Sequence, residues 1–319
     1  MPGDNSMAKY CITGGAGFLG SNLVEELLKR KHEVVVIDNL ATGRMCNLKP
    51  FLDKITFVQG SIIDLKLLKE TFKGVYYVFP QAAIPSVQKS VENPQDSFNV
   101  NATGTLNVLI AARDNNVKKV VYAASSSAYG DREGKYKVET MMPLPMSPYA
   151  AAKVASEHLC QSFAQVYGLP TVCLRYFNVF GPRQDPTSHY SAVIPLFIKA
   201  VLDDKQPTIY GDGLQSRDFT FIANNVEANI LAAENPDIKM GETINIATAQ
   251  AINLIDLLKL INKELGKDVQ PIFEEERAGD IKHSLADINK AKELLNYDGL
   301  VNFEDGLKKT IRWYADGNE

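Results

Sequence analysis

Short apolar runs rich in β-branched residues alternate with longer amphipathic stretches through the first half of this 319-residue chain. The runs are apolar along their whole length, which is typical of strands buried on both faces. Strands that alternate with helical stretches predict crossover connections, and hence a parallel sheet with helices on both sides. The predicted strands are KYCIT, EVVVID, ITFVQG, VYYVF, KKVVYAAS and TVCLRY, and two of the predicted helices are SNLVEELLKRK and NATGTLNVLIAARDNN.

The composition and pattern of the sequence change after about residue 178, where prolines, glycines and short mixed elements become frequent. Helical patterns return around residues 253–265 and 286–295. We therefore predict an α/β fold, in which a doubly wound Rossmann-type parallel sheet is followed by a smaller C-terminal α/β substrate lobe. The predicted domains are residues 7–178 and residues 179–319, with segments that interleave.

Composition excludes several classes of function. The net charge of −4 gives no basic footprint, so neither nucleic acid nor an anionic membrane is an expected partner. No apolar run is long enough to span a bilayer. The N-terminus MPGDNSMAKY lacks the apolar core of a signal peptide, and Met7 could be the natural start.

The cysteines and histidines show no spacing that is typical of a metal site or a redox dithiol. We therefore expect no metal, and we expect a cytoplasmic protein with reduced cysteines. The residues concerned are Cys11, Cys46, Cys160, Cys173, His32, His158, His189 and His283.

The segment ITGGAGFLGSN joins the first predicted strand to the first predicted helix. Its glycines Gly14, Gly17 and Gly20 have the spacing of a variant dinucleotide fingerprint. Glycines there let the backbone approach a pyrophosphate closely, at the donor-rich N-terminus of a helix. Asp38 ends the second predicted strand, where a carboxylate accepts hydrogen bonds from the adenosine ribose and repels a 2′-phosphate. Together the loop and the acid predict a site for NAD in preference to NADP.

A possible reactive set follows further along the chain. The predicted strand VVYAASSSAYG ends in serines that include Ser125 and Ser126, at the sheet edge where doubly wound folds bind ligands. The next segment, SPYAAAKVASE, predicts a helix capped by Ser147. Tyr149 and Lys153 lie four residues apart on this helix, so they share one face and can point at one target.

These motifs, taken together, resemble those of the extended short-chain dehydrogenases/reductases that modify nucleotide sugars. The similarity extends over nearly the whole chain after Met7, with several spaced motifs in the same order. Within that family the chain resembles the UDP-sugar 4-epimerases, especially those that act on UDP-N-acetylglucosamine. The matching segments are GGAGFLGS, Asp38, SSSAYG, YAAAK, LRYFNVFGPRQ, GDGLQSRDF and RAGDIKHSLAD.

The resemblance implies roles for individual residues. Tyr149 would be the acid/base, its phenolate favoured by Lys153 and by the positive nicotinamide ring. Lys153 would also hold the nicotinamide ribose, and Ser125, with Ser126 as the second candidate, would contact the sugar O4. The residues implied to bind NAD are Gly14, Gly17, Phe18, Leu19, Gly20, Asp38, Asn39, Gly43, Ile63, Asp64, Gln81, Ala82, Ala83, Asn101, Tyr149, Lys153 and Tyr176.

On the substrate side, Arg217 and Arg277 are implied to hold the diphosphate, whose oxygens suit the planar fork of a guanidinium group. Ser284 resembles a position that is small in epimerases admitting N-acetylated sugars and bulky in those limited to non-acetylated hexoses. The residues implied to bind substrate are Ser86, Asn178, Arg183, Val193, Tyr210, Arg217, Arg277, Asp280 and Ser284.

The implied reaction is an internal redox cycle. Tyr149 removes the O4 proton while C4 passes hydride to NAD, and the resulting 4-keto sugar turns about its link to the diphosphate before it takes hydride back on the other face. The chain is thus expected to be an NAD-dependent isomerase that interconverts UDP-N-acetylglucosamine and UDP-N-acetylgalactosamine, and also UDP-glucose and UDP-galactose, as in galactose metabolism. The resemblance also implies a homodimer formed through the NATGTLNVLIAARDNN helix and the Tyr149 helix.

Three alternatives are weighed against this prediction. A 4,6-dehydratase needs an acid/base pair after its hydroxyl residue, where this chain has Ser126, Ser127 and Ala128. A UDP-glucuronate 4-epimerase or decarboxylase needs a cation, which Lys89 could supply. A non-catalytic NAD-binding sensor would be expected to lack the tyrosine or the lysine.

Two positions depart from the family pattern. Pro80 stands before QAAIPSV, where the family often has histidine, and Asn224 stands where aspartate is commoner. Neither belongs to the Tyr149 set, and both bear on detailed affinity.

Overall fold

The computed structural model describes residues 7–132, 134–186, 192–276 and 282–317. The chain forms two compact units, each built from segments that are separate in the sequence. The predicted division into domains at residues 7–178 and 179–319 stays a prediction, because the units are defined by internal contacts alone. The first unit comprises Met1–Ala128, Pro145–Arg175 and Val226–Ile244, and the second comprises Tyr129–Leu144, Tyr176–Asn225 and Asn245–Glu319.

A seven-stranded sheet forms the centre of the first unit, in the order β11-β6-β5-β4-β1-β2-β3. β1 pairs in parallel with β2 on one side and with β4 on the other, so the strand order reverses between β1 and β4. Such a reversal opens a crevice at the carboxyl ends of the strands. The α/β fold is thereby confirmed. The strands are β1 (Lys9–Thr13), β2 (Glu33–Asp38), β3 (Ile55–Gln59), β4 (Tyr77–Pro80), β5 (Lys119–Ser125), β6 (Thr171–Tyr176) and β11 (Met240–Ile246).

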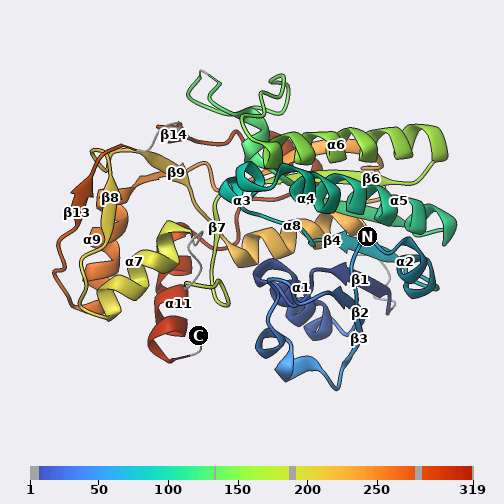
Figure 1. Cartoon of the computed structure of the whole chain (residues 1–319), viewed down its shortest axis with the longest axis horizontal. Helices are drawn as coiled ribbons and strands as arrows, with labels where there is room; N and C mark the ends of the chain where they lie inside the picture. The colour runs from blue at the N-terminus through green and yellow to red at the C-terminus, as the bar shows by residue number, and fades with distance from the viewer. Residues whose placement is uncertain (1–6, 133, 187–191, 277–281, 318–319) are drawn as a thin grey trace. The chain divides into compact units, whose positions relative to one another are not determined.

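Helices cover this sheet because its strands are apolar on both faces. One buried cluster joins β1, β2, β4, β5 and β6 to helices α2, α5 and α6, and α1 contacts β1 and β2 (Figure 1). The predicted NATGTLNVLIAARDNN helix begins as a π-helical turn at Asn99–Thr103 before α5. The helices are α1 (Phe18–Lys29), α2 (Leu65–Thr71), α3 (Val87–Glu92), α4 (Pro94–Phe98), α5 (Gly104–Asp114), α6 (Pro148–Tyr167) and α8 (Ile222–Glu234).

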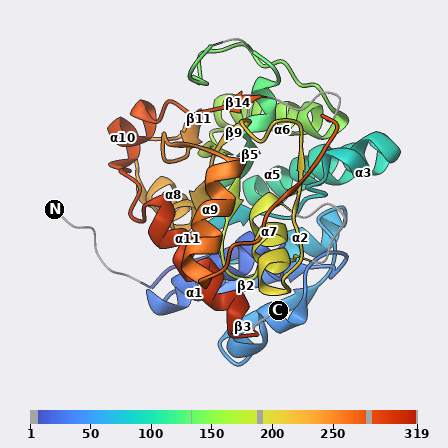
Figure 2. The same ribbon diagram turned by 90° about the vertical axis from the view of Figure 1, so that its left-hand side faces the viewer.

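Three helices and several two- or three-residue strands make up most of the second unit. Helices α7, α9 and α11 lie side by side (Figures 1 and 2). The unit also contains the three-stranded sheet β12-β9-β14 and the two-stranded pairs β10-β7 and β13-β8. The elements are β7 (Val179–Phe180), α7 (Val193–Leu202), β8 (Thr208–Tyr210), β9 (Ser216–Asp218), β10 (Thr220–Phe221), β12 (Ala251–Asn253), α9 (Leu254–Leu265), β13 (Ile272–Glu274), β14 (His283–Ser284), α10 (Asn289–Leu295) and α11 (Phe303–Ala315).

The two helices predicted in this region are present, but one starts later than its pattern suggests. Asn253 caps α9 by accepting from the Asp256 N–H, which fixes its start. α10 begins at Asn289 instead of residue 286. The reason is that Leu285 and Asp287 form backbone hydrogen bonds with Lys137 and the Ala286 N–H donates to Asp218, which together hold this segment out of a helix.

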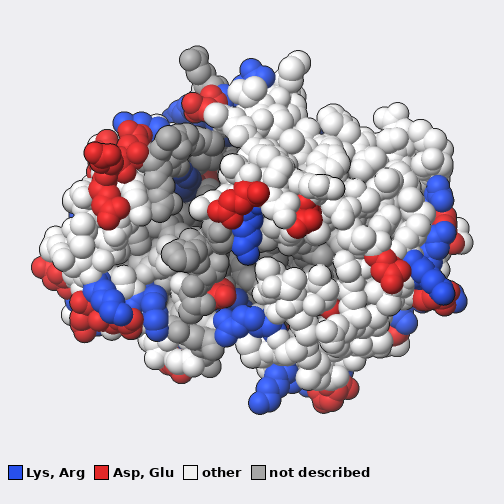
Figure 3. All heavy atoms as spheres, in the orientation of Figure 1, with Lys and Arg blue, Asp and Glu red and all other residues white. Residues whose placement is uncertain are grey.

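Within the described ranges, no helix has the length and apolar character needed to cross a membrane. The same ranges contain no group of three His, Cys, Asp or Glu side chains that could hold a metal ion. On the face shown in Figure 3, basic and acidic side chains of the described residues are interspersed.

Candidate functional site

The glycine-rich loop brings the chain close to itself at the end of β1. Gly14 has φ +72° and donates its N–H to the Ile37 carbonyl at 2.7 Å. A Cβ added to Gly14 would lie 2.6 Å from the Ala82 nitrogen, and one on Gly20 would lie 2.3 Å from the Gly14 oxygen. α1 starts after Gly17 without a side-chain cap. The loop therefore presents bare backbone at a helix N-terminus, as a pyrophosphate requires.

Asp38 lies beside this loop at the carboxyl end of β2. Its carboxylate accepts the Ala16 N–H at 2.9 Å and the Leu40 N–H at 2.8 Å. A Cβ on Gly43 would lie 2.8 Å from both carboxylate oxygens, so the space in front of the acid exists because residue 43 is glycine. Two backbone N–H groups fix the position of the carboxylate beside a space left by glycine, and this arrangement fits the adenosine ribose of NAD.

The other predicted NAD residues fall into two groups. Gln81 and Ala82 meet the loop directly, because their N–H groups donate to the Thr13 carbonyl and hydroxyl. Asn101 and Asp64 instead bind backbone groups of neighbouring segments. The Asn101 side-chain amide forms two hydrogen bonds with the backbone of Ile84, and Asp64 caps α2. Phe18 and Leu19 form the first turn of α1, Asn39 and Ile63 follow β2 and β3, Ala83 follows Ala82, and Tyr176 ends β6.

Helix α6 begins as its sequence predicts. Ser147 accepts the Ala150 N–H at 3.1 Å and Pro148 occupies the first turn. Lys153 lies one turn after Tyr149, with its ammonium nitrogen 5.9 Å from the centre of the Tyr149 ring. The predicted tyrosine–lysine face therefore exists, and it lies in the first unit together with the dinucleotide loop.

The serines at the end of β5 complete this set. Ser127 donates both its N–H, at 3.2 Å, and its hydroxyl, at 2.9 Å, to the Ser125 hydroxyl oxygen. The Ser125 proton is then free to be donated to another group. Burial raises the pKa of Tyr149, and a hydrogen bond with the Ser125 side chain opposes that rise. Lys153 was expected to lower the pKa of Tyr149. The pKa is raised instead, because burial of the ring disfavours the charged phenolate.

Lys153 is buried, with 5% of its surface exposed. Its ammonium donates to the Ala123 carbonyl at 2.7 Å and lies 5.0 Å from the centre of the Tyr122 ring. Desolvation lowers its pKa to about 8, while the charge of Glu157 acts in the opposite direction. Lys153 can therefore lose its proton close to neutral pH.

Glu157 and Arg175 form an ion pair that the sequence motifs did not indicate. Arg175 on β6 binds both carboxylate oxygens of Glu157 at 2.9 and 2.7 Å, and both side chains are 4% exposed or less. Glu157 lies one helical turn after Lys153, so the pair ties the tyrosine–lysine helix to the sheet. The sequence feature that could have indicated this ion pair is Glu157 itself, the last residue of SPYAAAKVASE, which lies four positions after Lys153 and so on the same helix face.

Glu157→Ala should lower the free energy of unfolding by about 3–5 kcal/mol, because it leaves the Arg175 charge buried without its carboxylate. Urea denaturation of the variant beside wild type measures the change. The double variant Glu157→Leu/Arg175→Leu should lose less, since no buried charge remains. The exposed pair Glu70 and Lys73 is the control, and Glu70→Ala should leave the midpoint almost unchanged. Equal losses in Glu157→Ala and the double variant would contradict this account.

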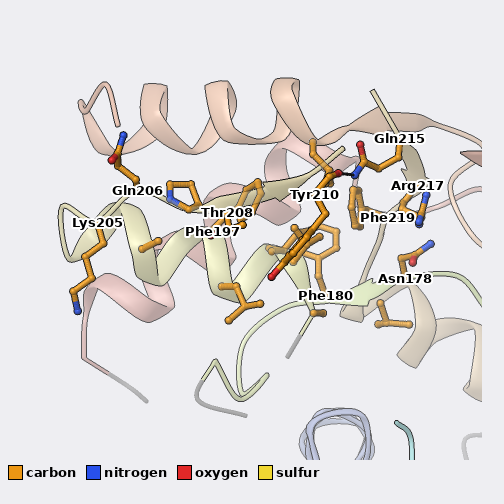
Figure 4. Close-up of a pocket in the computed structure, with 18 residues that line it drawn as sticks. Asn178, Phe180, Phe197, Lys205, Gln206, Thr208, Tyr210, Gln215, Arg217 and Phe219 are labelled. Carbon is orange, nitrogen blue, oxygen red and sulfur yellow. Dashed lines mark hydrogen bonds between the residues drawn. The ribbon is translucent and has the colours of Figure 1, made fainter. Parts of the chain in front are cut away.

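The second unit contains a pocket of about 560 Å³ (Figure 4). Arg217 and Asn178 lie close together at one end, and Lys205 and Gln206 lie at the other. Between the two ends the lining is mostly apolar and aromatic. The remaining lining residues are Val179, Phe180, Ala192, Val193, Ile194, Leu196, Phe197, Ala200, Pro207, Thr208, Tyr210, Gln215, Phe219 and Leu254. A cation and an amide at one end of an apolar slot suit a ligand with an anionic group and a flat ring.

Four predicted substrate residues line this pocket: Asn178, Val193, Tyr210 and Arg217. Ser284 lies next to it, because β14 pairs with β9 and places Ser284 opposite Arg217. Ser86 instead caps α3 in the first unit, and Arg183, at φ +72°, is not among the lining residues. Arg277 and Asp280 lie outside the described residues.

Sequence reasoning missed most of the apolar lining of the pocket. Two patterns in the sequence could have indicated this lining. In VIPLFIKAVL, Val193, Phe197 and Ala200 recur at helical spacing, and around Arg217 the alternate residues Gln215 and Phe219 face the same side of an extended segment.

Comparisons with known proteins show which family the chain resembles. A family model described as the NAD dependent epimerase/dehydratase family matches residues 10–247. The chain resembles the UDP-N-acetylglucosamine 4-epimerase of Methanobrevibacter ruminantium M1, solved in complex with UDP-N-acetylmuramic acid. It is 40% identical to that protein, the TM-score is 0.91, and the match covers 98% of this chain and 99% of the other.

Two further solved structures carry other ligands. The chain is 36% identical to the UDP-glucose 4-epimerase of Thermotoga maritima with UDP-glucose, with a TM-score of 0.92 and coverage of 98% and 100%. It is 33% identical to a variant of the UDP-glucuronic acid 4-epimerase of Bacillus cereus, with a TM-score of 0.89 and coverage of 97% and 99%. That variant was solved with UDP-4-deoxy-4-fluoro-glucuronic acid and NAD.

Proposed function

The chain belongs to the NAD dependent epimerase/dehydratase family and, within it, to the UDP-sugar 4-epimerases, and from this premise we propose that it interconverts UDP-N-acetylglucosamine and UDP-N-acetylgalactosamine. It also interconverts UDP-glucose and UDP-galactose. The observation that carries the proposal is the joint placement of Tyr149, Lys153 and Ser125 in the same unit as a dinucleotide loop.

The loop of Gly14, Gly17 and Gly20 would hold NAD together with Asp38 and Lys153. When bound, it supplies a hydride acceptor for the sugar C4 that returns the same hydride, and the positive charge of its oxidised ring favours the Tyr149 phenolate.

The side chains move and stabilise the proton. Tyr149 takes the O4 proton as the sugar is oxidised. After the 4-keto sugar has turned and is reduced on its other face, Tyr149 returns the proton to O4 of the epimer. Ser125 donates its free proton to O4 or to the phenolate, and so stabilises the negative oxygen in either position. Lys153, charged below pH 8, supports the phenolate from one helical turn away.

Substrate choice rests on Ser284 and on the pocket beside it. Arg217 and Asn178 suit the diphosphate, and the apolar slot suits the uracil ring. Ser284 is small, which leaves room for an acetamido group. UDP-glucuronate is the alternative substrate; its proposed cation, Lys89, is exposed on α3 in the first unit and gives that alternative no support from the pocket.

Return of the same hydride is tested with UDP-N-acetylglucosamine that carries deuterium at C4. The epimerised product should keep the deuterium at C4 in ordinary water, because the label passes out and back without exchange. Mass spectrometry and proton NMR of the product measure this. Exchange of the label with solvent would rule out the internal redox cycle.

The rate should rise with pH from 6 to about 8 and level off above pH 8. It rises because burial raises the pKa of Tyr149, so the phenolate fraction grows with pH over this whole range. Above pH 8 the Lys153 ammonium, whose pKa is lowered to about 8, loses its proton, and this loss offsets the further growth of the phenolate. kcat measured from pH 6 to 10, with circular dichroism at each pH to confirm folding, checks both parts of the profile. A rate that keeps rising steeply up to pH 10 would contradict the role given to Lys153.

A homodimer is the proposed assembly. Large apolar side chains are exposed on α3, α4 and α6, namely Val87, Val91, Phe98 and Val166, and these three helices contact one another within the first unit. Light scattering after size exclusion should give twice the chain mass of 35.2 kDa. A mass of 35.2 kDa at micromolar concentration would contradict the dimer.

A further inference from the structure

Asn245, at the end of β11, is fully buried, and its side-chain amide connects segments that are far apart in the sequence. Its Nδ2 donates to the Lys137 carbonyl at 2.9 Å and to the Asp287 carbonyl at 3.1 Å. Its Oδ1 accepts the Tyr129 hydroxyl at 2.7 Å, and its backbone N–H donates to Glu139 Oε1 at 2.8 Å. All five residues belong to the second unit, and both donors of the amide are used.

The segment 285–287 is held by two other residues besides Asn245. Lys137 donates its N–H to the Leu285 carbonyl at 2.7 Å and accepts the Asp287 N–H at 3.0 Å. Asp218, also fully buried, accepts the Ala286 N–H at 3.2 Å. We call Asn245, Asp218 and Lys137 the 285–287 clamp. Each of the three residues of the segment is fixed by at least one hydrogen bond.

The clamp lies next to Ser284, the residue on which the choice of sugar depends in the proposed function. Ser284 directly precedes the clamped segment and pairs in register with Arg217, which lines the pocket. Asp218 follows Arg217 on the same strand, so the clamp fixes both strands of the pair. Asn245 itself is not among the residues that line the pocket, and its amide contacts the clamped segment at Asp287.

We propose that Asn245 is a positioning residue for substrate specificity, which holds segment 285–287 so that Ser284 stays at the distance that fits an N-acetylated sugar. The inference rests on the proposed function. Losing the amide leaves the Asp287 carbonyl without this donor and leaves the Lys137 carbonyl with the Asp287 N–H alone, and the segment then shifts to find other partners. A shift of about 1 Å in a side chain that contacts the substrate can lower the rate up to about 100-fold. The loss should be large for a sugar whose acetamido group contacts Ser284 and small for a sugar that lacks this group.

Two variants remove the contribution of the Asn245 amide to the clamp, Asn245→Ala and the isosteric Asn245→Asp. Asn245→Asp keeps the acceptor for Tyr129 but has no amide protons for the two carbonyls. In both, kcat/KM for UDP-N-acetylglucosamine should fall about tenfold while that for UDP-glucose falls less than about threefold. Asn245→Asp decides the outcome if Asn245→Ala does not fold.

Tyr129→Phe is the matched control, because it removes a buried hydrogen bond to Asn245 but none to the segment. It should lower the melting temperature and keep the wild-type ratio of the two kcat/KM values. All variants are assayed well below their own melting temperatures. The clamp is overturned if the Asn245 variants keep the wild-type ratio, or if Tyr129→Phe shifts the ratio as far at an equal loss of stability. If wild type turns over neither sugar, the proposed function fails and the clamp fails with it.

Discussion

Tyr149→Phe should lower kcat about 10³-fold on every UDP-sugar that wild type converts, because the phenol is the group proposed to take and return the O4 proton. NAD should remain bound, since the dinucleotide loop and Asp38 are untouched by the change. The rate is measured by proton NMR, and the bound NAD is measured after acid release from the purified variant.

Tyr167→Phe is the control for this substitution. Tyr167 ends the same helix, α6, and is 51% exposed, so the same loss of a hydroxyl there should leave the rate unchanged. Activity of Tyr149→Phe within about tenfold of wild type would remove the tyrosine from the mechanism. A variant that had lost its NAD would instead place Tyr149 in cofactor binding.

Ser284→Tyr should lower kcat/KM for UDP-N-acetylglucosamine about 10²-fold and spare UDP-glucose. The phenol ring takes the space that the proposal gives to the acetamido group, and a clash in a fixed pocket discriminates more strongly than a missing contact. The clamped segment beside Ser284 gives the new ring little room to move aside.

The conservative change Ser284→Ala separates size from polarity. It stays small, so it should keep both substrates at similar relative rates, and the two variants are compared in one assay with both sugars. An equal loss on both sugars in Ser284→Tyr would show a general disturbance of the pocket and would contradict the size argument.

Local patterns in the sequence were enough to predict the sheet and the loop. Buried parallel strands, the glycine spacing of the loop and the capped start of α6 each depend on residues near one another in the chain. Tyr149 and Lys153 share a face because helical geometry places residues four apart on one side. This face was therefore predictable before any tertiary contact was known.

Long-range polar contacts were not predictable in this way. Arg175 lies 18 residues from Glu157, and Asn245 lies 116 residues from Tyr129 and 42 from Asp287. Asparagine and arginine are common at surfaces, so nothing local marks these two as buried. The raised pKa of Tyr149 was also missed, because desolvation depends on the packing around the ring and not on the neighbouring charge alone.

Purified protein mixed with UDP-N-acetylglucosamine, with no NAD added, and followed by proton NMR tests the central claim most directly. Our account predicts that signals of the galacto-configured product appear and reach a constant ratio, because the chain retains NAD and uses none of it up. The same spectra with UDP-glucose and UDP-glucuronate establish which sugar is preferred. If none of the three sugars changes, even after NAD is added, the proposed epimerase activity is contradicted.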